Sequence, residues 1–148
     1  MKPIGKLNMI TMMKIENKKT RFEYTFLETY EAGIVLTGME VKSIRLGNVN
    51  LTDTYCYFKD DELFVKNISI SLANGEPKRE RKLLLKKSQL RKLKSKLING
   101  LTIVPTKIYF NERNLIKVEI VLAQGKKLHD KRNTIKERDI QRDLQKNI

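Results

Sequence analysis

The stretch LTIVPTKIYFNERNLIKVEIVLA, residues 101–123, decides the fold class. Apolar side chains occupy every second position of its last part, at Ile116, Val118, Ile120 and Leu122. Lys117 and Glu119 fill the positions between them, and this period of two is typical of a strand with one buried face. Four polar residues interrupt the stretch and predict a hairpin turn. The stretch therefore predicts two antiparallel strands, at 101–110 and 115–123.

Further short strands are predicted on the N-terminal side of this hairpin. They are the alternating run 22–26, the apolar run 34–36, and the segments 54–58 and 62–70. Each combines aromatic or β-branched residues with polar neighbours, as half-buried strands do. Asp60 and Asp61 separate the last two segments and predict a second hairpin turn.

A short helix is predicted directly after residue 36. Thr37 and Glu40 match a capping box, in which each side chain accepts a hydrogen bond from the backbone N–H of the other residue. Val41, Ile44 and, as a further candidate, Leu46 would then face inward, and Gly47 would end the helix.

A second helix is predicted between the middle strands. Ser88 is its expected N-cap, and the dipeptide Asn99-Gly100 is expected to end it. The spacing of three and four that marks one apolar helix face occurs at Leu90, Leu93, Leu97 and Ile98. The basic residues of this helix are left for solvent or for a partner.

The number and length of these elements indicate a mainly β fold with small helices. About six short strands in one small domain suggest a closed antiparallel barrel, and the OB-like barrel is one such solution. The pattern leaves the order of the strands open. We expect a flexible leader at 1–16, an OB-like closed antiparallel β-barrel with flanking helices at 17–124, and a basic tail at 125–148.

The tail differs from the rest of the chain because its few apolar residues form only a narrow stripe. An isolated helix of this length is marginal in water. We therefore expect a conditionally disordered tail that becomes helical when it is bound. A tail helix packed on the barrel is the alternative.

The distribution of charge points to a polyanionic partner. The chain has 148 residues and a net charge of +14. Residues 1–77 carry 10 basic and 10 acidic side chains, whereas residues 78–148 carry 21 and 7. Neutralising phosphates releases counterions, which favours nucleic acid as the partner. A basic surface that serves solubility alone is the alternative, and a membrane surface would need a broad apolar helix face.

Residues that could support catalysis are scarce. The chain has one histidine, His129, and one cysteine, Cys56, far apart in sequence. No cluster suggests a zinc site, and no glycine-rich loop suggests a phosphate cradle. The acidic run 60–62 is expected to be a solvated turn. We therefore expect no enzyme activity, no metal, no cofactor, no small-molecule substrate and no membrane association, and the low cysteine content suits a cytoplasmic location.

The stretch EAGIVLTGMEVKSIR, residues 31–45, resembles the SsrA-binding protein (SmpB) family. Four further blocks resemble the family in the same order, and together the blocks cover over four-fifths of the chain. They are NKK with Arg21 and Tyr24 from residue 17, NLTDTY at 50–55, Pro77 with RKLLL at 81–85, and GKKLHDKR at 125–132.

The resemblance implies a function as well as a fold. Members bind the tRNA-like part of tmRNA, the SsrA RNA, and deliver it to bacterial ribosomes stalled without a stop codon, in trans-translation. The family fold is an OB-like barrel with a basic tail that occupies the empty mRNA path near the decoding centre of the small subunit, against its ribosomal RNA. We accordingly expect a cytoplasmic, monomeric, non-catalytic protein.

Residue roles follow from the block matches. Glu31, Leu84 and Lys117 match family contacts to the tmRNA elbow. Glu31 would accept a hydrogen bond from a base edge or a ribose, or would orient a neighbouring Lys or Arg. Leu84 would pack under a base or into the core. Further electrostatic contacts to tmRNA are expected from Lys18, Lys19, Arg21, Arg45 and Lys126. The ribosome-facing tail residues are Lys127, His129, Asp130, Lys131, Arg132, Lys136 and Arg138.

The chain departs from the family pattern at three places. The loop before RKLLL is shortened to residues 71–77, Phe22 occupies a position that is often His, and Gln124 stands where a basic residue is common. Two other functions stay open from residue chemistry alone. One is a generic ribosome-associated or single-stranded-RNA-binding OB protein, and the other is an enzyme acting on RNA.

Overall fold

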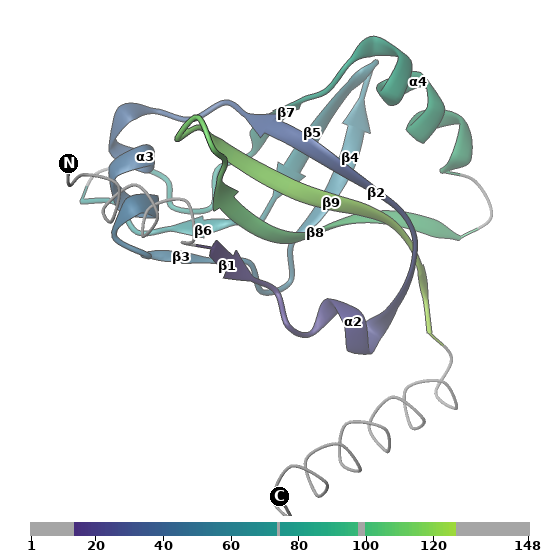
Figure 1. Ribbon diagram of the computed structural model, residues 1–148, viewed down its shortest axis with the longest axis horizontal. Helices are drawn as coiled ribbons and strands as arrows, with labels where there is room; N and C mark the ends of the chain where they lie inside the picture. Colours follow the sequence, from purple (N-terminus) through teal and green to yellow (C-terminus); the bar gives the residue numbers. More distant parts are fainter. Residues whose placement is uncertain (1–13, 74, 98–99, 127–148) are drawn as a thin grey trace, which may run out of the picture.

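The computed structural model describes residues 14–73, 75–97 and 100–126, and these form a mainly β structure with a few small helices (Figure 1). The helices are α2 (Thr20–Glu23), α3 (Gly38–Arg45) and α4 (Lys87–Lys96). The strands are β1 (Lys14–Glu16), β2 (Tyr24–Ile34), β3 (Val49–Asn50), β4 (Tyr55–Lys59), β5 (Glu62–Lys66), β6 (Ser69–Ile70), β7 (Arg81–Leu84), β8 (Leu101–Phe110) and β9 (Ile116–Gly125).

Six of the strands form a closed cycle of antiparallel pairings, which we call the strand ring. Its order is β8, β4, β5, β7, β2 and β9, and β9 pairs again with β8. The contact between β4 and β8 is the narrowest, with the single register pair Cys56 and Ile103. β1 adds to the outer side of β8, while β3 and β6 form a separate two-stranded sheet.

Both predicted hairpins are confirmed. In the turn between β8 and β9, Oδ1 of Asn111 accepts hydrogen bonds from the backbone N–H groups of Arg113 (3.0 Å) and Leu115 (2.9 Å). Asn114 adopts a positive φ of 61° there, which Asn tolerates better than most residues. Asp60 has a positive φ of 58° in the turn between β4 and β5, and Asp, like Asn, tolerates this conformation better than most residues.

The core lies inside the strand ring and receives buried side chains from two helices. Val118 and Ile120 of β9 are fully buried, as the alternation predicted. Ile44 of α3 and Leu93 of α4 join the same buried cluster. Leu46, the further candidate for the inward face of α3, is 70% exposed and does not join it. The two helices lie at opposite ends of the ring (Figure 1), so each closes part of the core against water.

The capping box of α3 is confirmed, and its glutamate has a second role. Thr37 Oγ1 accepts from the Glu40 N–H (3.2 Å), and Glu40 Oε1 accepts from the Thr37 N–H (2.9 Å). Glu40 is completely buried and forms ion pairs of 2.5 Å with both Arg79 and Arg81. Burial alone would raise the Glu40 pKa, but hydrogen bonds from Arg79, Thr37 and Arg81 outweigh it and lower that pKa to about 2.

The buried guanidinium of Arg81 explains why β7 escaped prediction. Its side chain is fully buried, yet its N–H groups donate to the carbonyls of Ile68 (2.8 Å), Arg79 (3.1 Å) and Pro77 (3.0 Å). The sequence of β7 therefore places a charge on the inward face. That charge conceals the alternation by which the other strands were found.

Other corrections concern the N-terminal region. Phe22 belongs to α2 and not to a strand, because the N–H groups of Phe22 and Glu23 donate to the Lys19 carbonyl and close a helical turn. β2 then runs without interruption to Ile34, so the run 34–36 is no separate strand. The prediction of a flexible leader is also wrong for residues 14–16, because they form β1 and pair with β8. Residues 1–13 lie outside the described part of the chain.

Two corrections concern the middle elements. α4 begins at Lys87, and its N-cap residue is Lys86 and not Ser88. The Gln89 side chain accepts a hydrogen bond from the Lys86 N–H (3.2 Å). The predicted strand 62–70 is interrupted at Asn67, whose φ is 74°.

Candidate nucleic-acid interface

Three residues expected to contact RNA lie on one outward face of the strand ring. Gly33 of β2 is the register partner of Leu84 in β7 on one side and of Lys117 in β9 on the other. Side chains of directly paired residues point to the same face of a sheet. Glu31 lies two residues before Gly33 in β2, hence on that face too, while Ala32 between them is fully buried. We call Glu31, Gly33, Leu84, Tyr109 and Lys117 the outward face.

The exposure of Leu84 decides between its two interpretations. Its surface is 49% exposed, so it does not pack into the core. A Cβ placed on Gly33 would lie 3.4 Å from the Leu84 Cβ, in van der Waals contact, so the glycine leaves the backbone beside Leu84 uncovered. A large apolar side chain is thus presented to solvent beside an open strip of backbone.

The partner of Glu31 within the described residues is a tyrosine, whereas one of its two interpretations gave it a neighbouring Lys or Arg. The Tyr109 hydroxyl donates a hydrogen bond to Glu31 Oε2, and Tyr109 is the register partner of Lys117. Burial, the bond to Glu31 and the nearby carboxylates raise the Tyr109 pKa above its ordinary value. The hydroxyl therefore keeps its proton and acts as a donor, which leaves Glu31 Oε1 available as an acceptor.

A second carboxylate lies directly across from Glu31. Glu119 is its register partner in β9, and like charges in such a pair repel. Lys107 Nζ lies 3.4 Å from Glu119, and the Thr106 hydroxyl donates to the same carboxylate (2.7 Å). Lys107 also lies 5.6 Å from the centre of the Tyr109 ring. Lys107 thereby offsets the repulsion between the two glutamates.

Lys18 and Arg21 extend the outward face towards α2. Both line a hollow that also includes Lys107 and Glu119. The Arg21 guanidinium lies 5.7 Å from the centre of the Phe26 ring, a cation–π distance. Phe22 lines the same hollow, so an aromatic ring is present at this departure from the family pattern.

The remaining expected contacts of the body lie elsewhere. Lys19 lines a different hollow, with Tyr55 and Asp53. Arg45 projects from α3 with its guanidinium 5.8 Å from the centre of the Phe110 ring. The Lys126 N–H donates to the Glu23 carbonyl (2.9 Å), which ties the end of β9 to α2. None of these three contacts involves Glu31, Leu84 or Lys117.

Comparison with known proteins gives the family. A family model described as SmpB protein matches residues 14–148. The chain belongs to the SmpB protein family. This confirms the resemblance that the sequence blocks indicated.

Individual relatives support the same assignment. The SsrA-binding protein of Phocaeicola vulgatus is 51% identical over 141 residues, which cover 90% of this chain and 94% of the relative. That of Agrobacterium fabrum is 45% identical over 146 residues, which cover 94% and 91%. A solved structure described as "tmRNA-SmpB: a journey to the center of the bacterial ribosome" contains a chain that is 50% identical, with a TM-score of 0.64. The match covers 78% of this chain and 85% of that one.

The tail residues expected to face the ribosome lie outside the described part of this SmpB-family chain. They are Lys127, His129, Asp130, Lys131, Arg132, Lys136 and Arg138.

Within the described residues, no group of three or more His, Cys, Asp or Glu side chains could hold a metal ion. The same part of the chain contains no helix of the length and apolarity that crossing a bilayer requires. Cys56 is buried, and burial raises the pKa of its thiol.

Two residues of this interface were missed in the sequence, namely Tyr109 and Lys107. Both alternate with buried residues in a strand that was correctly predicted, and both fall on the outward side. The predicted four-residue turn would have paired Tyr109 with Ile116. β9 begins one residue later than predicted, at Ile116, and this shift of register places Tyr109 opposite Lys117.

Proposed function

We propose that this chain binds tmRNA through its tRNA-like domain and delivers it to stalled bacterial ribosomes for trans-translation. Its partners would be tmRNA and the decoding centre of the small ribosomal subunit with its ribosomal RNA. It would act as a monomer in the cytoplasm, without catalysing a reaction. Family membership supports the proposal, as do relatives named SsrA-binding protein and the similar chain solved with tmRNA on the ribosome.

The observation that carries the proposal is the grouping of Glu31, Leu84 and Lys117 on three adjacent strands. The three side chains offer different kinds of contact. Lys117 can neutralise a phosphate, Leu84 can pack against a base or ribose, and Glu31 can accept a hydrogen bond from a base edge or a 2′-hydroxyl. A folded RNA element such as an elbow can present a phosphate, an unstacked base and a hydrogen-bond donor together. A regular duplex keeps its bases stacked, so it offers Leu84 no base surface.

We also propose that the strand ring is the OB-like closed barrel of the family and that residues from 127 on form the basic tail. The cycle of pairings supports the first part. The division between body and tail then falls after Lys126, because β9 runs to Gly125 and Lys126 is bonded to Glu23. In this division the body binds tmRNA, and the tail enters the empty mRNA path and substitutes for a missing codon–anticodon pair.

The test compares binding of the full chain to the tRNA-like domain of tmRNA and to a tRNA of equal length. The intact chain should prefer the tmRNA domain. Glu31→Ala should remove much of that preference, because a lost hydrogen bond to a charged group costs about 1.5–3 kcal/mol, or about 10- to 150-fold in affinity. Glu76→Ala is the matched control, since Glu76 is an exposed carboxylate outside the outward face.

A second candidate is generic binding of single-stranded RNA. The rings of Tyr55 and Tyr57 have centres 6.0 Å apart, and those of Tyr57 and Phe64 lie 6.2 Å apart on neighbouring strands. Aromatic side chains on an OB-like surface stack on bases without regard to sequence. If the chain binds the tmRNA domain, tRNA and an unstructured RNA equally, and Glu31→Ala changes none of the three, this candidate becomes the better account.

A further inference from the structure

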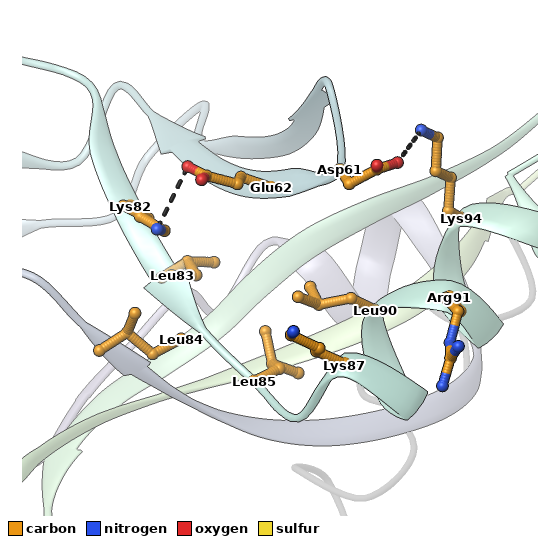
Figure 2. A pocket seen from close by; sticks show the side chains of 10 residues that line it. All are labelled: Asp61, Glu62, Lys82, Leu83, Leu84, Leu85, Lys87, Leu90, Arg91 and Lys94. Atoms are coloured by element: carbon orange, nitrogen blue, oxygen red, sulfur yellow. Dashed lines mark hydrogen bonds and ion pairs between the residues drawn. The ribbon is translucent and has the colours of Figure 1, made fainter.

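A groove beside the outward face has no role in the function proposed above. It has a volume of about 610 Å³ and lies between β7 and α4, next to the turn that joins β4 and β5 (Figure 2). Its apolar lining consists of Leu83, Leu84, Leu85 and Leu90. In Figure 2, Leu90 points from α4 towards β7, and charged side chains surround the leucines.

The acidic side chains of the groove are already matched by lysines. Glu62 pairs with Lys82 at 3.2 Å, and Asp61 pairs with Lys94 at 2.7 Å, on the side of the β4–β5 turn (Figure 2). Lys94 Nζ also donates to the Asp60 carbonyl (2.9 Å). These pairs contribute no net charge to the groove.

Two basic side chains of the α4 wall remain uncompensated. Lys92 and Lys96 of the same helix both pair with Glu28. By contrast, Lys87 and Arg91 make no side-chain hydrogen bond or ion pair within the described residues, and both line the groove. They lie four residues apart, so they are neighbours on one helix face. The groove therefore carries an excess of two positive charges above an apolar floor.

Helix stability does not account for these charges. The first turn of α4 contains Lys87 and no acidic residue. A cation at a helix N-terminus opposes the macrodipole, so Lys87 is unfavourable for the isolated helix. A bound anion would remove this conflict and would compensate Arg91 as well.

We propose that this groove binds a stretch of RNA backbone adjoining the segment held by the outward face. The inference rests on the proposed RNA-binding function. Leu84 belongs to both surfaces, so an RNA strand that crosses Leu84 enters the groove directly. Lys87 and Arg91 contact successive phosphates there, and the leucines pack against ribose and base surfaces. Arg91 can bind a phosphate with two parallel hydrogen bonds, whereas Lys87 acts as a point charge.

The first experiment removes the two charges. Lys87→Gln/Arg91→Gln is compared with Lys66→Gln/Lys78→Gln, in which both residues are exposed and lie outside the groove. Binding of each full chain to the tRNA-like domain of tmRNA is measured over a salt series. Loss of two phosphate contacts should lower the slope of log affinity against log salt by about 1.4–1.8. The control should keep the slope of the unmodified chain.

The second experiment locates the RNA. The chain has one cysteine, and it is buried, so a cysteine introduced at Lys87 can be labelled selectively. A tethered iron chelate at Lys87→Cys should cleave the tRNA-like domain beside the nucleotides cleaved from the same probe at Lys117→Cys. The probe at Lys66→Cys should not cleave that segment.

The outcomes separate this proposal from the function on which it rests. The function stands if the chain prefers the tmRNA domain and Glu31→Ala weakens that preference. The groove proposal is nevertheless wrong if the probe at Lys87→Cys leaves the RNA intact and the double variant keeps the salt slope of the unmodified chain. Polyglutamate serves as a further probe, in place of an acidic protein. If Lys87→Gln/Arg91→Gln weakens binding of the chain to polyglutamate but not to RNA, the groove binds an acidic protein and not RNA. Indiscriminate binding of all RNAs, unaffected by Glu31→Ala, overturns the function itself.

Discussion

Two glutamates nine residues apart show how one kind of side chain serves opposite purposes in this molecule. Glu40 is completely buried and is bound by two guanidinium groups and a backbone N–H. Glu31 is exposed and is bound by a single tyrosine hydroxyl. The carboxylate of Glu40 is satisfied inside the protein, whereas that of Glu31 keeps acceptor sites for a partner. The difference separates a residue that stabilises the fold from one that is oriented for binding.

The largest effect should follow from Glu40→Gln. Removing one partner of a buried ion pair leaves a buried charge uncompensated and costs about 3–5 kcal/mol. Arg81 would be that charge, because its guanidinium is fully buried. Urea or thermal unfolding measures the loss. The folded fraction should keep its preference for the tmRNA domain, and a loss of that preference without a loss of stability would break the distinction between the two glutamates.

The stability contributed by Glu40 should depend on pH. Its pKa in the folded state is about 2, below the ordinary value of 4.5. A carboxyl group whose pKa is lowered by folding stabilises the folded state above its ordinary pKa, and this contribution fades as the pH falls towards the folded-state value. The free energy of unfolding should therefore decrease between pH 4.5 and 2 more steeply in the unmodified chain than in Glu40→Gln. Equal slopes over this range would show that the ion pairs do not act as described.

The same comparison shows what the sequence could predict. Thr37 and Glu40 are three residues apart, so their capping box was evident from local spacing. The ion pairs of Glu40 reach Arg79 and Arg81, about forty residues further along the chain, and no local pattern indicates them. Because Arg81 faces inward, the strand that contains it was missed as well. Local periodicity therefore predicted the long hairpin, the shorter one and two helices, but not the polar contacts inside the core.

The candidate site was predictable to a different extent. The family resemblance indicated Glu31, Leu84 and Lys117, but their position on one face depends on the register of three strands. The hydrogen bond from Tyr109 depends on a side-chain contact across β9, and neither interpretation of Glu31 from residue chemistry included a tyrosine. Residue types predicted which contacts are chemically possible, and the register determined which of them form.

A smaller effect is expected from Tyr109→Phe, which tests whether Glu31 is oriented by its partner. The ring and its packing stay, and only the hydroxyl is lost. A net hydrogen bond contributes about 1 kcal/mol, so the preference for the tmRNA domain should fall about fivefold with little change in the unfolding midpoint. In the double variant with Glu31→Ala, the loss should equal that of Glu31→Ala alone. Additive losses would show that Tyr109 contacts the RNA independently.

The smallest expected effect, that of Lys117→Gln, distinguishes a charge from a specific acceptor on the same face. Lys117 contributes a phosphate contact, and phosphates are common to all RNAs. Its loss should weaken binding to the tmRNA domain and to tRNA by the same factor and should lower the salt slope by about 0.7–0.9. Glu31→Ala should do the reverse, reducing selectivity and leaving the slope unchanged. If Lys117→Gln abolishes selectivity while the slope stays constant, the side chain contacts a base, and the division of roles within the outward face must be revised.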